Sequence, residues 1–250
     1  MNAFLVGEQA DSIADLVTSS GIKIVEKESK SADFCICYGG DGTLLGAERD
    51  FPGLPKVPIR KRTNNRSAEN EFRLILERVV SKSHSITLLP KLLVTKNGLQ
   101  NEALNDVVLH NSRVVSAVRF RVEVDGLIPF QEIIGDGLVL ATPFGSSAYY
   151  RAITNSVIHV GLGLAFNNST ESVNHLVISE EAQIKIIVTR GPAVLAVDNN
   201  PDVWTVSDGD IIECKISPNK SEIWEINNLL CMENLSTGDS SRRLRWLEPK

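Results

Sequence analysis

The chain has 250 residues, 42% of them hydrophobic and 23% charged, a composition that suits one or two globular domains with a sizeable core. Its formal net charge of −5 gives no electrostatic reason to expect nucleic acid as a partner. The N-terminus lacks the basic flank and apolar run of a signal peptide, and no stretch approaches the ~18 apolar residues of a membrane span. The four cysteines show no paired spacing, so we predict a cytoplasmic protein without a metal site or disulfide framework.

Residues 1–85 alternate strand and helix signals joined by short connections, which predicts a small α/β domain with a parallel sheet. Short apolar runs predict strands at 3–6, 22–25 and 34–38. The run at 34–38 is apolar on both faces, as in a strand buried between helix layers, so Cys35 and Cys37 are predicted core residues. A stripe with helical spacing follows at Phe72, Ile75, Leu76 and Val79.

From about residue 86 the pattern changes, and short strands separated by turn signals predict a β-sandwich-like domain over 86–235. Residues 118–124 alternate apolar and charged side chains, which is typical of a half-buried strand. Asn-Gly or Asp-Gly pairs predict hairpin turns at 97–98, 125–126 and 208–209. The tail, 236–250, is predicted to dock back on the first domain because it carries Leu244, Trp246 and Leu247.

The sharpest local feature is Gly39-Gly40-Asp41-Gly42-Thr43, directly after the buried strand and before a helical stretch. Glycines let the backbone approach a bulky anion, and the N–H groups at a helix start offer partial positive charge to phosphates. A carboxylate inside a phosphate cradle is unfavourable unless it accepts a proton or helps hold a metal ion beside the phosphates. Asp41 is therefore a candidate catalytic residue. The alternative is a plain strand-to-helix turn that Asp41 merely bends.

A second motif spans residues 136–150 and reads DGLVLATPFGSSAYY. An apolar strand leads into a Thr-Pro turn and then into small hydroxyl residues at a helix start. Small residues allow close approach of a flat ring or a ribose, and hydroxyl and N–H groups at the turn would bond a polar ligand. The alternative is structural, with Ser146 and Ser147 capping the helix and Tyr149 belonging to the core.

The third motif is the polar pair Asn105-Asp106, which breaks an otherwise apolar strand at 103–108. Neighbouring side chains of a strand point to opposite faces, so at least one of the two is expected to face the interior or a cleft. A buried polar group needs a partner, which either an internal hydrogen bond or the amino and hydroxyl groups of a nucleotide would supply.

Together and in this order, the three motifs resemble the NAD kinase family. GGDGT alone is shared with diacylglycerol and sphingosine kinases, and the TP-x-GS-x-AY segment narrows the choice. The resemblance covers nearly the whole chain and implies an α/β half followed by a β-sandwich half. It also implies an enzyme that uses ATP and Mg²⁺ to phosphorylate the 2′-hydroxyl of the adenosine ribose of NAD, giving NADP.

The resemblance implies roles for three groups of residues. The phosphate site would comprise Gly39, Gly40, Gly42 and Thr43, with Asp41 as the general base or orienting group nearest the reacting hydroxyl. The NAD site would comprise Asp41, Gly42, Asn105, Asp106, Thr142, Ser147, Ala148 and Tyr149. Asp136 would contact the nicotinamide end of NAD, including NAD bound to a neighbouring subunit, which makes a homodimer or homotetramer part of the site.

The chain departs from the family pattern in four segments. The family's Asn-x-Gly-x-x-Gly-Phe-Leu segment is replaced by residues 57–66, its Ala-Gly-Gly-Pro run by 153–156, and a Pro-His-Ser-Leu-like segment by 167–172. The usual Asp-Gly late in the chain is Asp198-Asn199. The first replacement is basic, and it either contacts a triphosphate, through Arg60 and Arg62, or forms a solvated loop. The basic residues are Lys56, Arg60, Lys61, Arg62 and Arg66.

These departures leave two alternatives beside NAD kinase. A lipid or small-alcohol kinase would share GGDGT, but the TP-x-GS-x-AY segment has no obvious use there. A non-catalytic sensor would bind NAD or NADP without turnover. The favoured prediction is an NAD kinase whose partners are NAD and a nucleoside triphosphate or polyphosphate, with no nucleic acid and no membrane.

Overall fold

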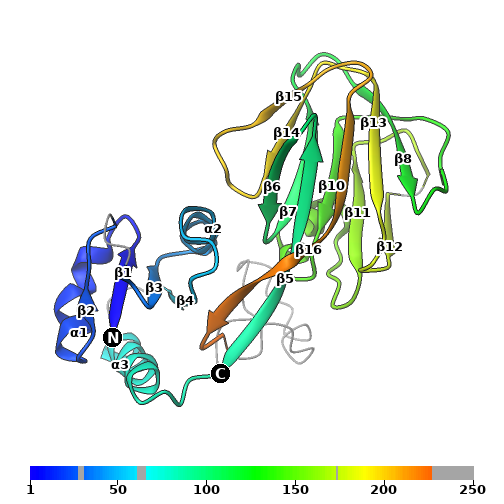
Figure 1. Cartoon of the computed structure of the whole chain (residues 1–250). Helices are drawn as coiled ribbons and strands as arrows, with labels where there is room; N and C mark the ends of the chain where they lie inside the picture. The colour runs from blue at the N-terminus through cyan, green and yellow to red at the C-terminus, as the bar shows by residue number, and fades with distance from the viewer. Residues whose placement is uncertain (28–30, 61–65, 173, 227–250) are drawn as a thin grey trace. The chain divides into compact units, whose positions relative to one another are not determined.

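The computed structural model describes residues 1–27, 31–60, 66–172 and 174–226, and the described chain forms two compact units. The first unit comprises Met1–Leu89 together with the return of the chain from Lys220, and the second comprises Pro90–Asn219 (Figure 1). The predicted docking tail, 236–250, lies outside the described residues, as do Arg62 and Cys231.

The first unit is an α/β fold built on a parallel sheet with the strand order β2-β1-β3-β4. The strands are β1 (Asn2–Val6), β2 (Lys23–Ile24), β3 (Phe34–Tyr38) and β4 (Lys56–Ile59). The helices are the short 3₁₀ helix η1 (Ala10–Ile13), α1 (Ala14–Ser19), α2 (Asp41–Asp50) and α3 (Arg66–Val80). All five residues of β3 are buried, as a central strand covered on both faces requires. The predicted parallel α/β domain is confirmed.

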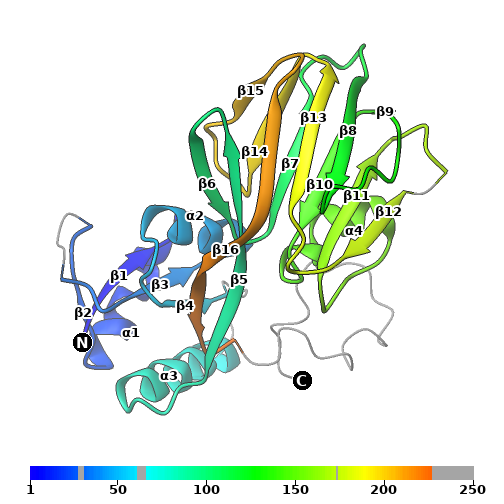
Figure 2. The ribbon, with the colours of Figure 1, turned by 45° about the vertical axis from the view of Figure 1, so that its right-hand side comes forward.

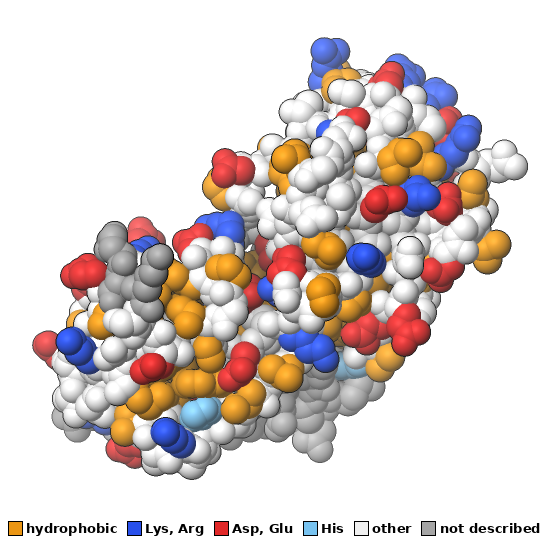
Figure 3. Space-filling view, viewed as in Figure 1, with side chains coloured by type: hydrophobic (Ala, Val, Ile, Leu, Met, Phe, Trp, Pro, Cys, Tyr) orange, Lys and Arg blue, Asp and Glu red, His pale blue; other side chains and the backbone are white. Residues whose placement is uncertain are grey.

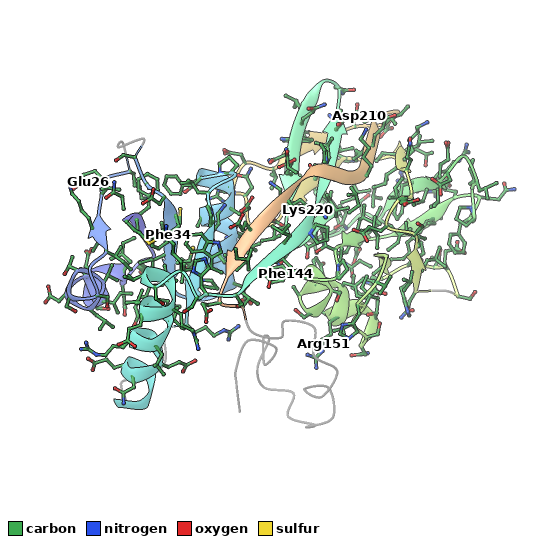
Figure 4. The ribbon with its side chains drawn as sticks, turned by 60° about the horizontal axis from the view of Figure 1, so that its bottom comes forward. Glu26, Phe34, Phe144, Arg151, Asp210 and Lys220 are labelled. Atoms are coloured by element: carbon green, nitrogen blue, oxygen red, sulfur yellow. The ribbon has the colours of Figure 1, made fainter. Side chains whose placement is uncertain are left out.

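The core of the first unit forms where the helices cover this sheet. Leu76 and Val79 of α3 are fully buried, and Phe34, labelled in Figure 4, packs on Trp224 with ring centroids 5.2 Å apart. Cys35 and Cys37 lie in this core, as predicted. Burial raises the pKa of the Cys35 thiol to about 11, so it stays a small apolar side chain at neutral pH.

A buried ion pair fixes α2 to the sheet. The Lys56 side chain is completely buried, and its ammonium contacts the Glu48 carboxylate and donates to the Phe51 carbonyl at 2.9 Å. The Ser221 hydroxyl donates to the same carboxylate at 2.6 Å. The grouping of Lys56 with a triphosphate-binding basic cluster is therefore wrong, because this lysine neutralises an internal carboxylate instead.

The second unit is a β-sandwich, shown from two sides in Figures 1 and 2. One sheet has the order β12-β11-β10-β7-β14-β15, and the other contains β5, β6, β16, β13, β8 and β9. The strands of the first sheet are β7 (Asp106–Asn111), β10 (Gly137–Ala141), β11 (Leu162–Asn167), β12 (His175–Ile178), β14 (Ala193–Val197) and β15 (Trp204–Val206). Those of the second are β5 (Ile86–Lys96), β6 (Leu99–Ala103), β8 (Val118–Val124), β9 (Ile133–Gly135), β13 (Ile184–Arg190) and β16 (Ile211–Trp224).

Alternating side chains divide the sandwich into layers. Leu109 and Leu140 of one sheet meet Phe120 and Ile186 of the other in the main core. The intervening residues, such as Val108, face outward and pack instead against the segment 145–158, which contains η2 (Gly145–Ser147) and α4 (Tyr149–Thr154). The predicted β-rich architecture is confirmed, and one sheet carries a helical cover on its outer face.

Two of the three predicted hairpin turns form where the sequence places them. The third prediction is wrong, because Asp208-Gly209 connects β15 to β16, which lie in different sheets and do not pair with each other. Asn97-Gly98 has φ of 50° and 82°, and Asp125-Gly126 has φ of 51° and 81°, as a two-residue loop with both residues left-handed requires. Directly before the Asn97-Gly98 turn, the Lys96 ammonium pairs with the Asp210 carboxylate at 3.0 Å. Asp210, labelled in Figure 4, lies just before β16. These contacts tie the β5–β6 turn to the β15–β16 turn.

Acidic and basic side chains are interspersed over the face shown in Figure 3. That mixture agrees with the slight negative charge of the whole chain, and it forms no broad basic field on this face. Of the helices in the described part of the chain, none has the length and apolar character needed to cross a membrane.

Candidate active site

The GGDGT segment lies at the carboxyl end of β3, where the chain turns from strand to helix. Helix α2 begins at Asp41 with Gly40 as its N-cap residue, so Asp41, Gly42 and Thr43 form its first turn. The Gly39 N–H donates to the Ile59 carbonyl of β4 at 3.0 Å. A Cβ at Gly39 would lie 2.2 Å from the Thr43 hydroxyl oxygen, so a larger residue does not fit.

A cavity of about 280 Å³ opens beside this turn. It lies outside the carboxyl ends of three parallel strands, which is where open α/β sheets bind their ligands. The N-terminus of α2 points its positive dipole end to the same region. The lining residues are Glu8 and Gln9 after β1, Tyr38, Gly39, Gly40 and Thr43 after or at the end of β3, and Arg60 after β4.

Arg60 joins this cavity to the candidate catalytic carboxylate. Its guanidinium Nη2 lies 3.3 Å from Oδ1 of Asp41, and the two side chains are 27% and 35% exposed. The Arg60 Nε is buried and has no hydrogen-bond partner among the described residues. A proton acceptor and a cation able to bind an anion in two-point fashion therefore stand side by side. Lys61, Arg62 and the Arg66 side chain lie outside the described residues.

The polar pair Asn105-Asp106 lies where the chain crosses from one sheet of the sandwich to the other. Strand β6 ends at Ala103 in one sheet, and β7 begins at Asp106 in the other. The expectation of one continuous strand through both residues is wrong, because the crossing interrupts the strand at Leu104 and Asn105. Both side chains are buried, with 9% of Asn105 and 6% of Asp106 exposed.

The crossing leaves one buried acceptor and one perturbed acid. The side-chain oxygen Oδ1 of Asn105 is buried and has no hydrogen-bond partner among the described residues. Burial, followed by the negative charge of Asp198, raises the pKa of Asp106 to about 7. An unmet acceptor beside a carboxyl group that titrates near neutrality is suited to receive amino and hydroxyl donors of a ligand.

The side chain of Thr142, the residue after β10, supports this crossing. Its hydroxyl is completely buried, donates to the Leu104 carbonyl at 2.7 Å and accepts the Gly145 N–H at 3.0 Å. A Cβ at Gly145 would lie 2.0 Å from the Asn105 carbonyl oxygen, so glycine lets the two motifs touch through their backbones. The second and third motifs of the sequence are therefore parts of one construction.

The hydroxyl residues after the Thr-Pro turn hold the segment in shape without capping α4, whose N-cap residue makes no side-chain bond. The Ser146 hydroxyl donates to the Pro143 carbonyl at 2.8 Å and accepts the Ile158 N–H at 3.1 Å. Ser147 is buried, whereas Ala148 and Tyr149 are partly exposed. Phe144, buried before η2, and Arg151, exposed on α4, bracket this segment in Figure 4.

Amide side chains surround Asp136 and Tyr149. Asn111 and Asn168 donate to the two carboxylate oxygens of Asp136 at 3.2 and 3.0 Å. Asn167 donates to the Tyr149 hydroxyl at 3.0 Å. Burial raises the pKa of Tyr149, and the charges of Asp136 and Asp106 add to that rise, so the phenol stays protonated near both carboxyl groups.

Sequence reasoning missed these three asparagines. Asn167 and Asn168 belong to the segment that replaces a family motif, and they are the last residue of β11 and the residue after it. The available signal was the pair of consecutive amide side chains at a strand end, because amide groups near carboxylates usually form hydrogen bonds with them. Asn111 gave no signal, because it ends an ordinary strand.

Comparison with known proteins identifies the relatives of this chain. The chain is 31% identical over 215 residues to the NAD kinase of Koribacter versatilis, covering 78% of this chain and 75% of that enzyme. This chain belongs to the NAD kinase family. The NAD kinase of Azotobacter vinelandii is 25% identical over 233 residues, covering 85% of this chain and 78% of that protein. The family model for the ATP-NAD kinase C-terminal domain matches residues 104–226.

Two solved structures of NAD kinase relatives share the fold. Yeast NADH kinase complexed with NADH has a TM-score of 0.72 at 19% identity, covering 81% of this chain and 65% of that one. An NAD kinase from Archaeoglobus fulgidus in complex with ATP has a TM-score of 0.70 at 18% identity, covering 89% and 93%. The α/β unit followed by a β-sandwich is thus an NAD kinase fold.

The raised pKa of Asp106 makes the stability of the protein depend on pH. A carboxyl group whose pKa is higher in the folded than in the unfolded state destabilises the fold progressively as pH rises between the two values, here from about 4 to about 7. Asp106→Asn removes that penalty. Between pH 4.5 and pH 7.5 we expect the free energy of unfolding of the variant, measured by urea denaturation, to rise relative to that of wild type by ~3 kcal/mol.

The control is Asp202→Asn, a substitution at an exposed aspartate in the β14–β15 loop, which should show no such trend. If wild type and Asp106→Asn keep a constant difference at both pH values, Asp106 does not titrate in this range.

Proposed function

We propose that this chain is an NAD kinase that transfers the γ-phosphoryl group of ATP to the 2′-hydroxyl of the adenosine ribose of NAD. The observation that carries the proposal is the pairing of Asp41 with Arg60 at the cavity of the GGDGT turn, in a member of the NAD kinase family. A phosphoryl-transfer site needs an anion cradle and a proton acceptor together, and both are present there. The names of the relatives, NAD kinase and NADH kinase, support the same acceptor.

In the proposed mechanism the 2′-hydroxyl attacks the γ-phosphorus in line, and the bond to the leaving ADP oxygen breaks. Asp41 accepts or orients the hydroxyl proton. Such transfers depend mostly on alignment and charge stabilisation, with a positioned base adding about 10²–10⁴-fold. The ion pair with Arg60 keeps Asp41 oriented before substrate binds.

The triphosphate is proposed to bind at the carboxyl ends of β1, β3 and β4. The backbone of the α2 N-terminus and the Arg60 guanidinium would contact its oxygens. Mg²⁺ bound with the triphosphate would neutralise part of the phosphate charge, and the Asp41 carboxylate would be the protein group able to contact it. The described residues contain no group of three or more His, Cys, Asp or Glu side chains that could hold a metal ion by themselves. The proposed set is Gly39, Gly40, Gly42, Thr43, Arg60 and Arg62.

NAD is proposed to bind at the sheet crossing of the sandwich. The unmet acceptor of Asn105 suits the amino group of an adenine, and the Asp106 carboxylate suits ribose hydroxyls. The partly exposed Ala148 and Tyr149 would form the wall against the flat ring, while Thr142 and Ser147 support that wall from within. The proposed set is Asp41, Gly42, Asn105, Asp106, Asp136, Thr142, Ser147, Ala148 and Tyr149.

We further propose that residues 1–85 bind the triphosphate and carry the catalytic GGDGT motif, while 86–235 form the NAD-binding domain that supplies the other NAD contacts. Asp136 would contact the nicotinamide end, including that of NAD on a neighbouring subunit, in a homodimer or homotetramer. Light scattering of the purified chain checks this, since a monomer at assay concentration would contradict it.

A cytoplasmic location is proposed because Cys35, Cys37 and Cys214 are free thiols.

The activity is tested with Asp41→Asn. Purified protein with NAD, ATP and Mg²⁺ should form NADP, followed with an NADP-specific dehydrogenase. Removing the base should lower kcat by about 10²–10⁴-fold while calorimetry still shows NAD binding. Asp50→Asn, at the other end of the same helix, is the matched control and should turn over like wild type.

Wild-type turnover by Asp41→Asn would contradict the role of Asp41. NAD binding without turnover in the wild type would instead favour the sensor, and phosphorylation of diacylglycerol would favour the lipid kinase.

The contribution of the basic segment is tested by neutralising Arg60 and Arg62 together, as Arg60→Gln with Arg62→Gln. Losing charge-assisted hydrogen bonds to phosphate should raise the KM for ATP by about tenfold or more, with a smaller effect on the KM for NAD. Arg49→Gln, an exposed arginine on α2 that pairs with Asp50, is the control. An unchanged KM for ATP in the double variant would remove this segment from the triphosphate site.

A further inference from the structure

The turn after β14 places Asp198 against the sheet crossing of the sandwich. Its carboxylate accepts three consecutive backbone N–H groups, from Leu104 at 2.7 Å, Asn105 at 2.8 Å and Asp106 at 3.1 Å. The Asp198 N–H donates in return to the Asp106 carbonyl at 2.9 Å. Four hydrogen bonds thus connect one residue to the three that form the crossing.

The crossing requires such an acceptor. Between β6 and β7 the backbone leaves one sheet before it enters the other, and buried N–H groups without a partner are costly. The Thr142 hydroxyl donates to the carbonyl groups of Leu104 and Asn105, and the Asp198 carboxylate accepts the N–H groups that are left. Two carboxylate oxygens accept three donors, which a single amide or hydroxyl oxygen in that place cannot do equally well.

The backbone of Asp198 indicates that the side chain has a specific task. Its φ of 49° lies in the left-handed region, where glycine is the residue without strain. Aspartate tolerates this conformation better than most residues, and here it adds the acceptor that glycine lacks.

We propose that Asp198 is a positioning residue for the dinucleotide, which holds Asn105 and Asp106 in the geometry that binds NAD. This inference rests on the proposed function, because it assigns the cause of that site's geometry. Asp198 acts through the backbone of the crossing, whereas Asn105 and Asp106 present their own side chains.

A second, electrostatic effect accompanies the first. The ionisable groups that face Asp106 are Asp198 and the Tyr149 phenol of α4. The flanking strands β10 and β14 contribute only apolar residues, GLVLA and AVLAV. The negative charge of Asp198 raises the pKa of Asp106 in addition to the larger effect of burial. Neutralising Asp198 therefore lowers the pH at which Asp106 ionises, and this distinguishes Asp198 from a merely structural residue.

The test compares Asp198→Asn with two other variants of the whole chain. Asp198→Asn keeps one oxygen acceptor and removes the charge. It should raise the KM and the calorimetric Kd for NAD about tenfold, leave the KM for ATP within about twofold, and move the pH inflection of the KM for NAD to lower pH. Thr142→Val loosens the same crossing without changing charge, so it should weaken NAD binding and leave the inflection in place.

Asp125→Asn is the matched control. Asp125 also has a left-handed φ, of 51°, and its carboxylate also accepts a backbone N–H, from Gln183 at 2.9 Å, but it contacts no part of the crossing. Its kinetics should match those of wild type. Thermal denaturation of all variants verifies that each is folded at the assay temperature.

An Asp198→Asn enzyme with wild-type KM for NAD and an unmoved inflection would overturn the proposal. Equal losses in the KM for NAD and for ATP would also overturn it, because they would indicate general unfolding. If wild type binds NAD but forms no NADP, the proposed activity fails while the NAD titrations still decide the role of Asp198. A wild type that neither binds NAD nor turns over would end both proposals.

Discussion

The sandwich depends on one short crossing, in which the chain passes from β6 to β7 and so from one sheet to the other. Where the chain leaves a sheet, its backbone N–H and carbonyl groups lose the hydrogen bonds to the neighbouring strand, and the protein interior has no water to replace those bonds. Thr142 supplies a donor for the carbonyl groups, Asp198 an acceptor for the N–H groups, and Gly145 the space for close approach. Segments about 40 and 90 residues away therefore converge on Asn105 for reasons of backbone chemistry alone.

The first unit positions its chemistry by a different means. A parallel strand buried on both faces fixes where β3 ends, and the glycine at position 39 lets the chain enter α2 at once. The buried pair of Lys56 and Glu48 then locks the body of that helix onto β4. Asp41 and Arg60 end up together because they follow neighbouring parallel strands, β3 and β4, at the same edge of the sheet.

The sequence predicts what is decided locally and misses what is decided by contacts between distant segments. The uniformly apolar β3, the alternating β8 and the hairpin turns at Asn97-Gly98 and Asp125-Gly126 have their signals within a few residues, and these form as expected. The hairpin expected at Asp208-Gly209 does not form, because β15 pairs within one sheet and β16 within the other. The break at Asn105, the burial of Lys56 and the amides around Asp136 depend on partners 8 to 93 residues away. A charged residue is predicted to be exposed unless a buried partner of opposite charge is known. The sequence gives no sign that Glu48 is such a partner, so it places Lys56 in the basic cluster wrongly.

The segments that depart from the family pattern still supply polar side chains that contact the candidate site residues. Arg60 stands in the replaced segment and holds Asp41, while Asn167 and Asn168 stand in another and hold Tyr149 and Asp136. At the crossing, an acceptor without a partner and an acid whose pKa is raised to about 7 both cost folding free energy. Apolar residues of similar shape in these two positions would avoid that cost. The retained polar groups therefore favour a site that binds a ligand over a site that has lost its function. The Lys56–Glu48 pair differs from the crossing in this respect. Its two opposite charges neutralise each other inside the protein, so the pair gives no reason to expect a ligand.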